Sequence, residues 1–348
     1  MKASWTPLFL ELRKPFRIAR STRDSVTTVA LSIEHAGIQG YGEASPSPRY
    51  GESVEGTIEF FKKLDLSLFE SPFLLEDILA YVNGLELGNH AAKCAVDIAL
   101  HDWIGKAVGR PVHQILGLNP RKTAPSSYTI GIGSKQEIME KLEEAKDYPV
   151  LKIKLGTEHD IETMETVRSL SDKMIYVDVN EGWKTRELAC ERMKWLEDFN
   201  IEFVEQPMPA GSLDDIRWLK ERCSLPIFAD EGIGRLNELA EVAAVYDGIN
   251  IKIMKCTGLR EAHRMITVAK ALGLKVLLGC MIESSIGISA AAQLAPLVDY
   301  ADLDGNILIS NDPCDGVRNT GGLLALNHIP GIGIQWKNGK DGGLQVST

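Results

Sequence analysis

The sequence has no long hydrophobic run, no excess of positive charge and no clustered cysteines, and each absence argues against a class of protein. No apolar run is long enough to cross a bilayer, so a membrane-spanning protein is not expected. The formal net charge of −10 argues against nonspecific binding to nucleic acid or to an anionic membrane surface. The six cysteines are scattered without a C-x-x-C pair, which predicts neither a zinc site nor a disulfide framework.

The first residues also lack the pattern of a secretory signal. The stretch MKASWTPLFLELRKPF has no continuous apolar core and no small-residue cleavage site. We therefore expect a cytoplasmic protein that acts on a small molecule and has neither nucleic acid nor membrane as a partner. The 348 residues suffice for one large or two ordinary domains, and a homo-oligomer is compatible with the sequence.

Residues 1–120 have a mixed α+β pattern. Two strand patterns, LFLELRKPFRIA and VTTVALSIEHAGIQGYGEA, flank a predicted polar loop at residues 20–24, and the second pattern turns at residues 35–37. A second polar loop follows at SPSPRYGES. Three helical patterns come next, with apolar residues three and four apart: SVEGTIEFFKKL, LLEDILAYVNGL and HAAKCAVDIALHDWIGKAVG.

Residues 121–318 alternate short β-rich runs with amphipathic helices. Eight runs fit this rhythm: SSYTIGI, VLKIKL, MIYVDVN, EFVEQP, PIFADE, GINIKI, KVLLGC and YADLDG. Eight strands in a β-α rhythm predict a parallel barrel of the TIM type, with an open doubly wound sheet as the alternative. No G-x-G-x-x-G follows the first strand of this region, which argues against a dinucleotide site. The Gly-rich residues 319–348 are too few for another βα unit, and we expect them to pack back on the N-terminal region.

Charged residues recur at the ends of consecutive strand runs. The series is Lys154, Asp178, Glu205, Asp230 and Lys252, with steps of 22 to 27 residues, about one strand, one helix and two loops. Each residue therefore returns to the carboxyl end of its strand, where barrel enzymes carry their chemistry. Any one of these residues alone would more simply be a helix cap or a solvated side chain. Their concurrence on five strands favours a site.

The central three of these residues predict a metal site. Carboxylates from three neighbouring strands repel one another, which raises their pKa or requires a cation. Oxygen donors favour a hard divalent ion, and Mg²⁺ with open positions for substrate oxygens fits best; the donors do not distinguish it from Mn²⁺.

The flanking lysines predict proton transfer. A metal-held carboxylate stabilises the enediolate that forms when the α-proton leaves. We expect Lys154 to remove that proton from one face and Lys252 to return it on the other, with pKa values lowered by the nearby cations. Lys255 is an alternative to Lys252, which we prefer because it lies nearer the strand body. The run LKIKLG places Lys152 on the same strand face as Lys154.

With these residues identified, the chain resembles the enolase superfamily, muconate-lactonizing subgroup, over nearly its whole length. The resemblance rests on YGEASP, KIKLG, DVNEGW, VEQP, ADEG and NIKIMKCTG, in that order. It implies a (β/α)7β modified TIM barrel under an α+β capping domain built from the N-terminal region and the extreme C-terminus. It also implies that Asp178, Glu205 and Asp230 bind Mg²⁺ and that Lys154 and Lys252 form the acid/base pair.

Within that subgroup the chain is most similar to dipeptide epimerases of the L-Ala-D/L-Glu type. The motif DLDG carries this similarity, because the carboxylates of Asp302 and Asp304 would pair with the free α-ammonium of a dipeptide. A pair of turn-forming aspartates is the alternative interpretation. The resemblance implies further substrate contacts for Lys152, which would help hold the substrate carboxylate, and for Thr129, Met281, Ile282 and Ser284.

Two capping loops are expected to set the side-chain specificity, as the resemblance implies. Arg20, Arg23 and Arg49 could each bind an acidic C-terminal residue, or each could be a solvated loop arginine. Glutamate-specific members of the subgroup carry an arginine five residues after the strand's phenylalanine. Counted from Phe16, that position is Ser21. Glutamate specificity is therefore not implied, and dipeptides with a hydrophobic or other C-terminal residue remain alternative substrates.

The leading hypothesis is therefore a Mg²⁺-dependent dipeptide epimerase that inverts the α-carbon of the C-terminal residue by a two-base 1,1-proton transfer. An o-succinylbenzoate synthase, N-succinylamino acid racemase or cycloisomerase would share the metal and the lysines without needing the aspartate pair. A remote alternative is a protein that binds a carboxylate ligand without turnover.

Overall fold

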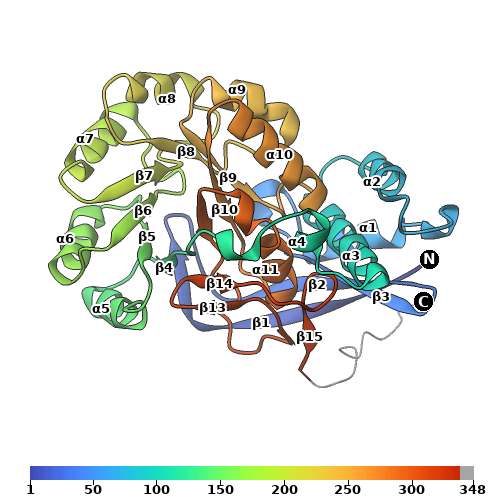
Figure 1. Ribbon diagram of the computed structural model, residues 1–348. Helices are drawn as coiled ribbons and strands as arrows, with labels where there is room; N and C mark the ends of the chain where they lie inside the picture. Colours follow the sequence, from blue (N-terminus) through green and yellow to red (C-terminus); the bar gives the residue numbers. More distant parts are fainter. Residues whose placement is uncertain (338–348) are drawn as a thin grey trace.

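The computed structural model describes residues 1–337, which form a capping part and a barrel (Figure 1). The capping part starts with a three-stranded antiparallel sheet in the order β1-β2-β3 and continues with four helices. Its elements are β1 (Lys2–Ile18), β2 (Ser21–His35), β3 (Ile38–Ala44), α1 (Val54–Lys62), α2 (Leu75–Gly84), α3 (His90–Val108) and α4 (Val112–Ile115).

Helix α3 packs directly on strand β3 because the strand has two glycines at the contact. A Cβ at Gly40 would lie 2.1 Å from the carbonyl oxygen of Ala99, and one at Gly42 would lie 1.9 Å from that of Ala95. No larger side chain fits at this separation, so Gly in the sequence GYGEA fixes how closely the helix approaches the sheet. This contact holds the end of β3, and hence the segment after it, in place above the barrel.

The barrel consists of eight parallel strands in sequential order, β4 to β11. A bridge from Ser126 to Ala301 brings the last strand beside the first. The elements are β4 (Tyr128–Ile130), α5 (Lys135–Glu144), β5 (Val150–Lys154), α6 (Asp160–Leu170), β6 (Met174–Asp178), α7 (Arg186–Leu196), β7 (Ile201–Glu205), α8 (Leu213–Lys220), β8 (Ile227–Ala229), α9 (Leu239–Ala243), β9 (Gly248–Lys252), α10 (Leu259–Ala271), β10 (Lys275–Gly279), α11 (Ser285–Ala292) and β11 (Tyr300–Asp302). The predicted (β/α)7β barrel with an α+β cap is thus confirmed, and the open sheet is excluded.

Side chains inside the barrel change from aromatic to charged along its axis. Toward the amino ends of the strands, Phe203 stacks on Phe228 with ring centroids 4.0 Å apart, and Tyr176 stacks on Phe203 at 4.5 Å. Toward the carboxyl ends, Lys152 and Lys154 share the inner face of β5, and both are buried. The aromatic layer closes the amino end of the barrel, so the charged layer is reached from the capping side.

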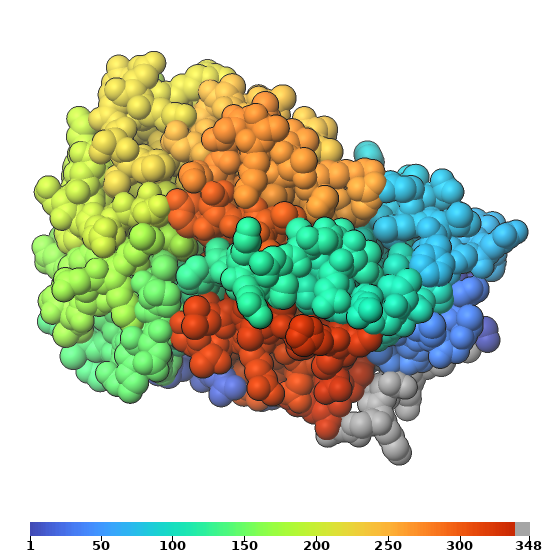
Figure 2. All heavy atoms as spheres, viewed as in Figure 1, coloured from blue at the N-terminus to red at the C-terminus, as the bar shows by residue number. Residues whose placement is uncertain are grey.

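The C-terminal residues return to the capping part, where they contact α3 and the segment after it. Strands β12 (Cys314–Asp315), β13 (Arg318–Thr320), β14 (Leu323–Ala325) and β15 (Gln335–Trp336) form two small sheets. Trp336 packs edge-on against Tyr41, and the Ile332 amide donates a hydrogen bond to Asp102. Figure 2 shows this segment, in red, against residues near 110, in teal. Residues 338–348 of the predicted C-terminal segment lie outside the described residues, and the boundaries at 120 and 318 stay predictions.

One predicted loop is a strand. Residues 21–24 begin β2, which pairs with β1 from Ile18 opposite Ser21 to Phe16 opposite Arg23. Only residues 19 and 20 form the turn, because the run STRDSVTT supplies β-branched threonines that suit an extended backbone despite its polarity. The arginines expected in a loop therefore lie on or beside a hairpin tip. No helix within residues 1–337 is long and apolar enough to span a membrane.

Candidate active site

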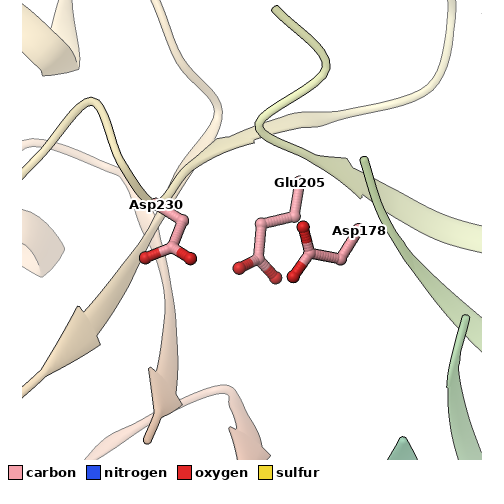
Figure 3. Close-up of side chains that lie close together, drawn as sticks. All are labelled: Asp178, Glu205 and Asp230. Carbon is pink, nitrogen blue, oxygen red and sulfur yellow. The ribbon is translucent and has the colours of Figure 1, made fainter. Parts of the chain in front are cut away.

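Three carboxylates from three neighbouring strands converge at the carboxyl end of the barrel (Figure 3). Asp178 ends β6, Glu205 ends β7 and lies opposite Asp178 in the sheet, and Asp230 follows β8 directly. All three are buried, and one oxygen of each lies within 4.8 Å of those of the other two. This spacing allows the three oxygens to share one metal ion.

The electrostatics of the cluster fit a divalent cation. Burial, with Asp178 and Asp230 adding to it, raises the pKa of Glu205 to about 8. Burial would also raise the pKa of Asp178, but Lys154 and Lys152 outweigh it and hold that pKa at about 2. The donors are all carboxylate oxygens, the ligands that hard cations prefer. A cation at their centre would relieve the repulsion that Glu205 feels.

The two lysines expected to flank the cluster contact its outer members. Lys154 Nζ lies 2.5 Å from Asp178 Oδ2, and Lys252 Nζ lies 2.8 Å from Asp230 Oδ2. Both are largely buried, and both line one cavity. Lys255 instead lies beneath Asp230, 2.6 Å from its Oδ1 and donating to the carbonyl of Asn250, and it does not line that cavity.

The carboxylates of the site raise the pKa of Lys252 and of Lys152, and lowering by a bound cation stays a prediction. Burial lowers the pKa of Lys252, but the carboxylate of Asp230 more than offsets it, so the pKa lies above its usual range. The same holds for Lys152, whose burial is outweighed by Asp302, Glu205 and Asp178. The acidic residues of this site therefore act on these two lysines more strongly than the neighbouring ammonium groups do.

Strands β4 and β11 supply a second polar group on the other side of Lys152. Lys152 Nζ lies 2.8 Å from Asp302 Oδ2, whose other oxygen accepts a hydrogen bond of 2.7 Å from Ser127 Oγ. Asp304 Oδ2 accepts one of 2.8 Å from the amide of Thr129. Burial and the charge of Asp302 raise the pKa of Asp304 to about 6. Asp304 makes no direct ion pair within the described residues, although Lys141 and Lys152 act on its charge at longer range, and it can receive a ligand cation.

The cavity that joins these groups has a volume of about 400 Å³. Met281 and Ile282 line it, as expected, but Ser284 does not. Ser284 is fully buried, caps α11 and donates a 2.7 Å hydrogen bond to Glu43, because it lies where the capping part meets the barrel. The cavity lining comes from both parts of the molecule: Phe16, Ile18, Arg20, Ser21, Arg23, Ser45, Pro46, Ser47, Pro48, Arg49, Thr129, Lys152, Lys154, Asn180, Lys252, Cys280, Met281, Ile282, Asp302, Asp304 and Leu308.

Family models match both parts of the chain. The mandelate racemase / muconate lactonizing enzyme N-terminal domain matches residues 6–117, and the enolase C-terminal domain-like model matches residues 136–340. The chain therefore belongs to the mandelate racemase / muconate lactonizing enzyme family. This agrees with the resemblance to the enolase superfamily drawn from the motifs.

The named relatives of this family member include several epimerases and an N-succinyl-L-Arg/Lys racemase. The chain is 48% identical to an L-Ala-D/L-Glu epimerase of Bacteroides thetaiotaomicron over 335 residues, 96% of this chain and 88% of the relative. It is 40% identical to an L-Ala-D/L-amino acid epimerase of Pedosphaera parvula, with 95% and 97% covered. Its fold matches, with a TM-score of 0.91 and 30% identity over 96% of this chain and 99% of the other, the crystal structure of a dipeptide epimerase from Enterococcus faecalis complexed with Mg and L-Leu-L-Tyr.

The three capping arginines of this family member have different surroundings. Arg20 Nη1 lies 2.6 Å from Glu231, and Arg49 makes two hydrogen bonds to Glu181. Arg23 is half-buried in the cavity lining and has no acidic partner among residues 1–337. Its pKa is lowered by burial and by the charge of Arg20. Only Arg23 therefore presents an uncompensated guanidinium to the cavity.

Sequence reasoning missed Glu181 and Glu231, although both lie in quoted motifs. Each lies at the end of a strand close behind a carboxylate of the cluster, in DVNEGW and ADEG respectively. An acidic residue in that place could have been recognised as a second layer around the site. It also missed Ser127 and Asn250, which donate hydrogen bonds to Asp302 and Glu205.

Proposed function

We propose that this protein is a Mg²⁺-dependent dipeptide epimerase that inverts the α-carbon of the C-terminal residue. One observation carries the proposal: Lys154 and Lys252 contact opposite ends of the carboxylate cluster, and both reach the same cavity. A substrate carbon above the cluster would have an amine on each side, as proton exchange with inversion requires. The named relatives and the structure with Mg and a dipeptide support this assignment.

The residues would divide the reaction as follows. When bound to Asp178, Glu205 and Asp230, Mg²⁺ supplies a Lewis acid for the substrate carboxylate. Lys152 would neutralise the same carboxylate from the barrel interior. Lys154 and Lys252 would take and return the α-proton, one on each face, so each lysine serves as base for one epimer and as acid for the other.

The aspartate pair would select a free ammonium group. Asp304 makes no direct ion pair in the described chain, and Asp302, paired with Lys152, adds negative charge next to it. An N-succinyl substrate would bring a carboxylate to this place, where it would be repelled. This disfavours the succinylamino acid racemase and o-succinylbenzoate synthase alternatives.

Arg23 favours dipeptides with an acidic C-terminal residue. A half-buried guanidinium without an acidic partner gains most from an anion, and Arg23 lines the cavity from the β1–β2 hairpin of the capping part. Ser21 occupies the position where glutamate-specific members carry arginine, and Arg23 lies two residues further along β2. We infer that Arg23 takes over that contact.

Exchange in heavy water tests the assignment. Metal-loaded protein is incubated in D₂O with acidic, hydrophobic and cationic L-Ala-L-Xaa dipeptides, and α-deuterium is followed by mass spectrometry or NMR. We expect incorporation together with inversion, fastest for acidic Xaa. No incorporation with any dipeptide would refute the proposal. Binding without exchange would favour the carboxylate-binding alternative.

A further inference from the structure

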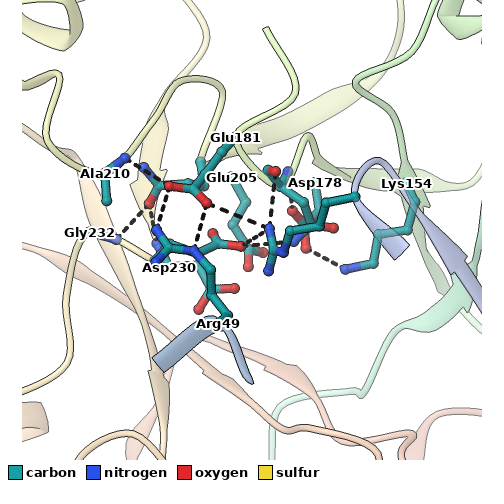
Figure 4. Close-up of polar contacts among 12 residues, drawn as sticks. Arg49, Lys154, Asp178, Glu181, Glu205, Ala210, Asp230 and Gly232 are labelled. Carbon is teal, nitrogen blue, oxygen red and sulfur yellow. Dashed lines mark hydrogen bonds and ion pairs between the residues drawn. The ribbon is translucent and has the colours of Figure 1, made fainter. Parts of the chain in front are cut away.

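Glu181 receives contacts from both segments that cover the cavity (Figure 4). Arg49, in the segment after β3, donates to both of its oxygens at 2.9 and 2.8 Å. Arg20, at the turn between β1 and β2, lies 3.7 Å from Oε2. The amide of Ala210 donates to Oε1 at 3.0 Å. Two covering segments distant in sequence thus meet at one carboxylate of the barrel.

Arg20 is also tied to a neighbouring carboxylate. Its Nη1 lies 2.6 Å from Glu231 Oε1 and donates to the carbonyl of Asn180 at 3.1 Å. The side chain of Asn180 donates to the same oxygen of Glu231 at 3.2 Å. The two arginines therefore bind a continuous network on the ends of β6 and β8. Movement of one arginine changes the charge that the other faces.

The backbone that carries Glu181 is strained. Asn180 has φ 47° and Glu181 has φ 65°, a region that residues with side chains rarely adopt. The amide of Glu181 donates to the carbonyl of Gln206, and the amide of Trp183 donates to that of Pro207, so the next barrel loop holds this conformation. Strain of this kind persists where the surrounding structure enforces it, commonly at functional sites.

The two arginines stand beside the residues that enclose the cavity. Arg20 is next to Ser21 and Arg49 is next to Pro48, and all four residues line the cavity. The side chain of Glu181 is 11% exposed, against 34% and 36% for Arg20 and Arg49, so the shared carboxylate is the buried partner. Glu181 does not line the cavity itself and lies outside the carboxylate cluster.

We propose that Glu181 is a positioning residue that couples the two covering segments, residues 17–25 and 46–52, so that they close over the cavity as one unit. The shared carboxylate makes each closed segment favour closure of the other. Arg20 and Arg49 carry like charges and would repel one another without it. The coupling is a property of the cover and does not depend on which molecule the cavity accepts.

Hydrogen exchange measured by mass spectrometry tests the coupling without turnover. Full-length wild type, Arg49→Ala and Glu181→Gln are compared, with Arg222→Ala as the control because Arg222 lies at the end of α8 with an exposed partner, Glu221. For both test variants we expect about fivefold faster exchange in peptides from both covering segments, the size of one partly buried ion pair. The deciding result is faster exchange in residues 17–25 of Arg49→Ala, a segment that Arg49 itself does not belong to.

The outcomes separate coupling from its alternatives. Faster exchange in residues 46–52 alone would overturn the proposal, as would unchanged exchange in both segments. Exchange in residues 17–25 that returns to the wild-type rate in Arg49→Lys would support the proposal. Lysine restores a positive charge beside Glu181 but cannot make the two hydrogen bonds of the arginine. If Glu181→Gln fails to fold, Arg49→Ala decides alone, since it alters only the covering segment.

Kinetics supply a second readout where turnover is found. A coupled cover predicts that Glu181→Gln raises KM about fivefold while kcat changes less, because the chemical groups are untouched. An equal loss in kcat would instead place Glu181 in the chemistry and overturn its role as a positioning residue. If no dipeptide turns over, the proposed function fails, but the amide hydrogen exchange of the protein still decides whether the two segments are coupled.

Discussion

Lys152 Nζ lies 2.8 Å from Asp302 Oδ2 and 2.9 Å from Glu205 Oε2. One buried ammonium group therefore connects the carboxylate cluster to the aspartate pair. Lys152 is 1% exposed, and its charge is balanced by acidic groups on both sides. A substrate that spans the cavity would thus have its carboxylate and its ammonium placed on either side of the same lysine.

Each lysine of the proposed acid/base pair should be required for α-proton exchange with a different epimer of the substrate. Lys154→Ala should lose α-deuterium exchange with one epimer by about 10²–10⁴-fold, and Lys252→Ala with the other, because each removes the base for one face. Single-turnover exchange in D₂O with each pure epimer measures this. Loss of the same epimer in both variants would contradict the two-base assignment. The control is Lys255→Ala, because Lys255 does not line the cavity but pairs with Asp230. It tests whether loss of an ion pair to Asp230 alone produces the same loss of exchange with one epimer.

Asp304 should govern the binding of the substrate ammonium. Asp304→Asn should raise KM for dipeptides by about 10–100-fold, since a charge-assisted contact is lost. The pKa of Asp304, raised to about 6, means that its charge is lost as pH falls through that value, so the wild-type KM should rise below pH 6. KM measured from pH 5 to 8 checks both statements. A flat profile in the wild type would remove Asp304 from ammonium recognition.

Arg23 should set the preference for acidic side chains. Arg23→Ala should lower kcat/KM for L-Ala-L-Glu by about 10–100-fold and leave L-Ala-L-Leu within about threefold. Competition between the two dipeptides in one reaction measures the ratio directly. The matched control is Arg17→Ala on the same hairpin, whose guanidinium pairs with Glu137 outside the cavity. Equal losses on both dipeptides would assign Arg23 a structural role.

Removal of divalent metal should abolish exchange and destabilise the fold. Chelation leaves three buried carboxylates with only the neighbouring lysines to balance their charge. Mg²⁺ or Mn²⁺ should restore exchange and raise Tm by a few degrees through binding to the native state. Differential scanning fluorimetry with and without metal measures the shift. Glu205→Gln should abolish the metal-dependent rise in Tm while the metal-free protein gains stability. A rise of equal size in that variant would place the metal elsewhere.

Glu283 should make stability fall as pH rises. Burial, with Glu43 nearby, raises its pKa from 4.5 to about 8, so the native state holds a proton that the unfolded chain has released between these values. The contribution of Glu283 to the free energy of unfolding is therefore greatest below pH 4.5. It falls by roughly a few kcal/mol as the pH rises from 4.5 to 8. Urea unfolding at pH 5, 7 and 9 measures it.

Glu283→Gln should flatten that pH dependence. Glutamine keeps the acceptor for the 2.7 Å hydrogen bond from the Met281 amide and never ionises. The variant should match wild type at pH 5 and exceed it at pH 9. Glu143→Gln, on the exposed side of α5, is the control and should stay within about 0.5 kcal/mol of wild type at every pH. Parallel curves for wild type and Glu283→Gln would contradict the buried proton.

The sequence by itself determined the barrel and the ring of charges at its mouth. Regular steps from Lys154 to Lys252 return each charge to the same end of its strand, because strand, helix and loops fill a nearly constant length. Side-chain alternation likewise places Lys152 and Lys154 on one face of β5. These features depend on local periodicity, which one chain displays without its partners.

Only the tertiary structure decided which groups meet across the cavity. Lys252 rather than Lys255 faces it, because the chain turns after β9 and carries Lys255 under Asp230. Residues 21–24 became a strand because β1 lies beside them, and Glu181 became a shared partner because Arg20 and Arg49 approach from segments more than 130 residues away. Contacts of this range follow from closing the barrel and seating the cap upon it, and no local pattern encodes them.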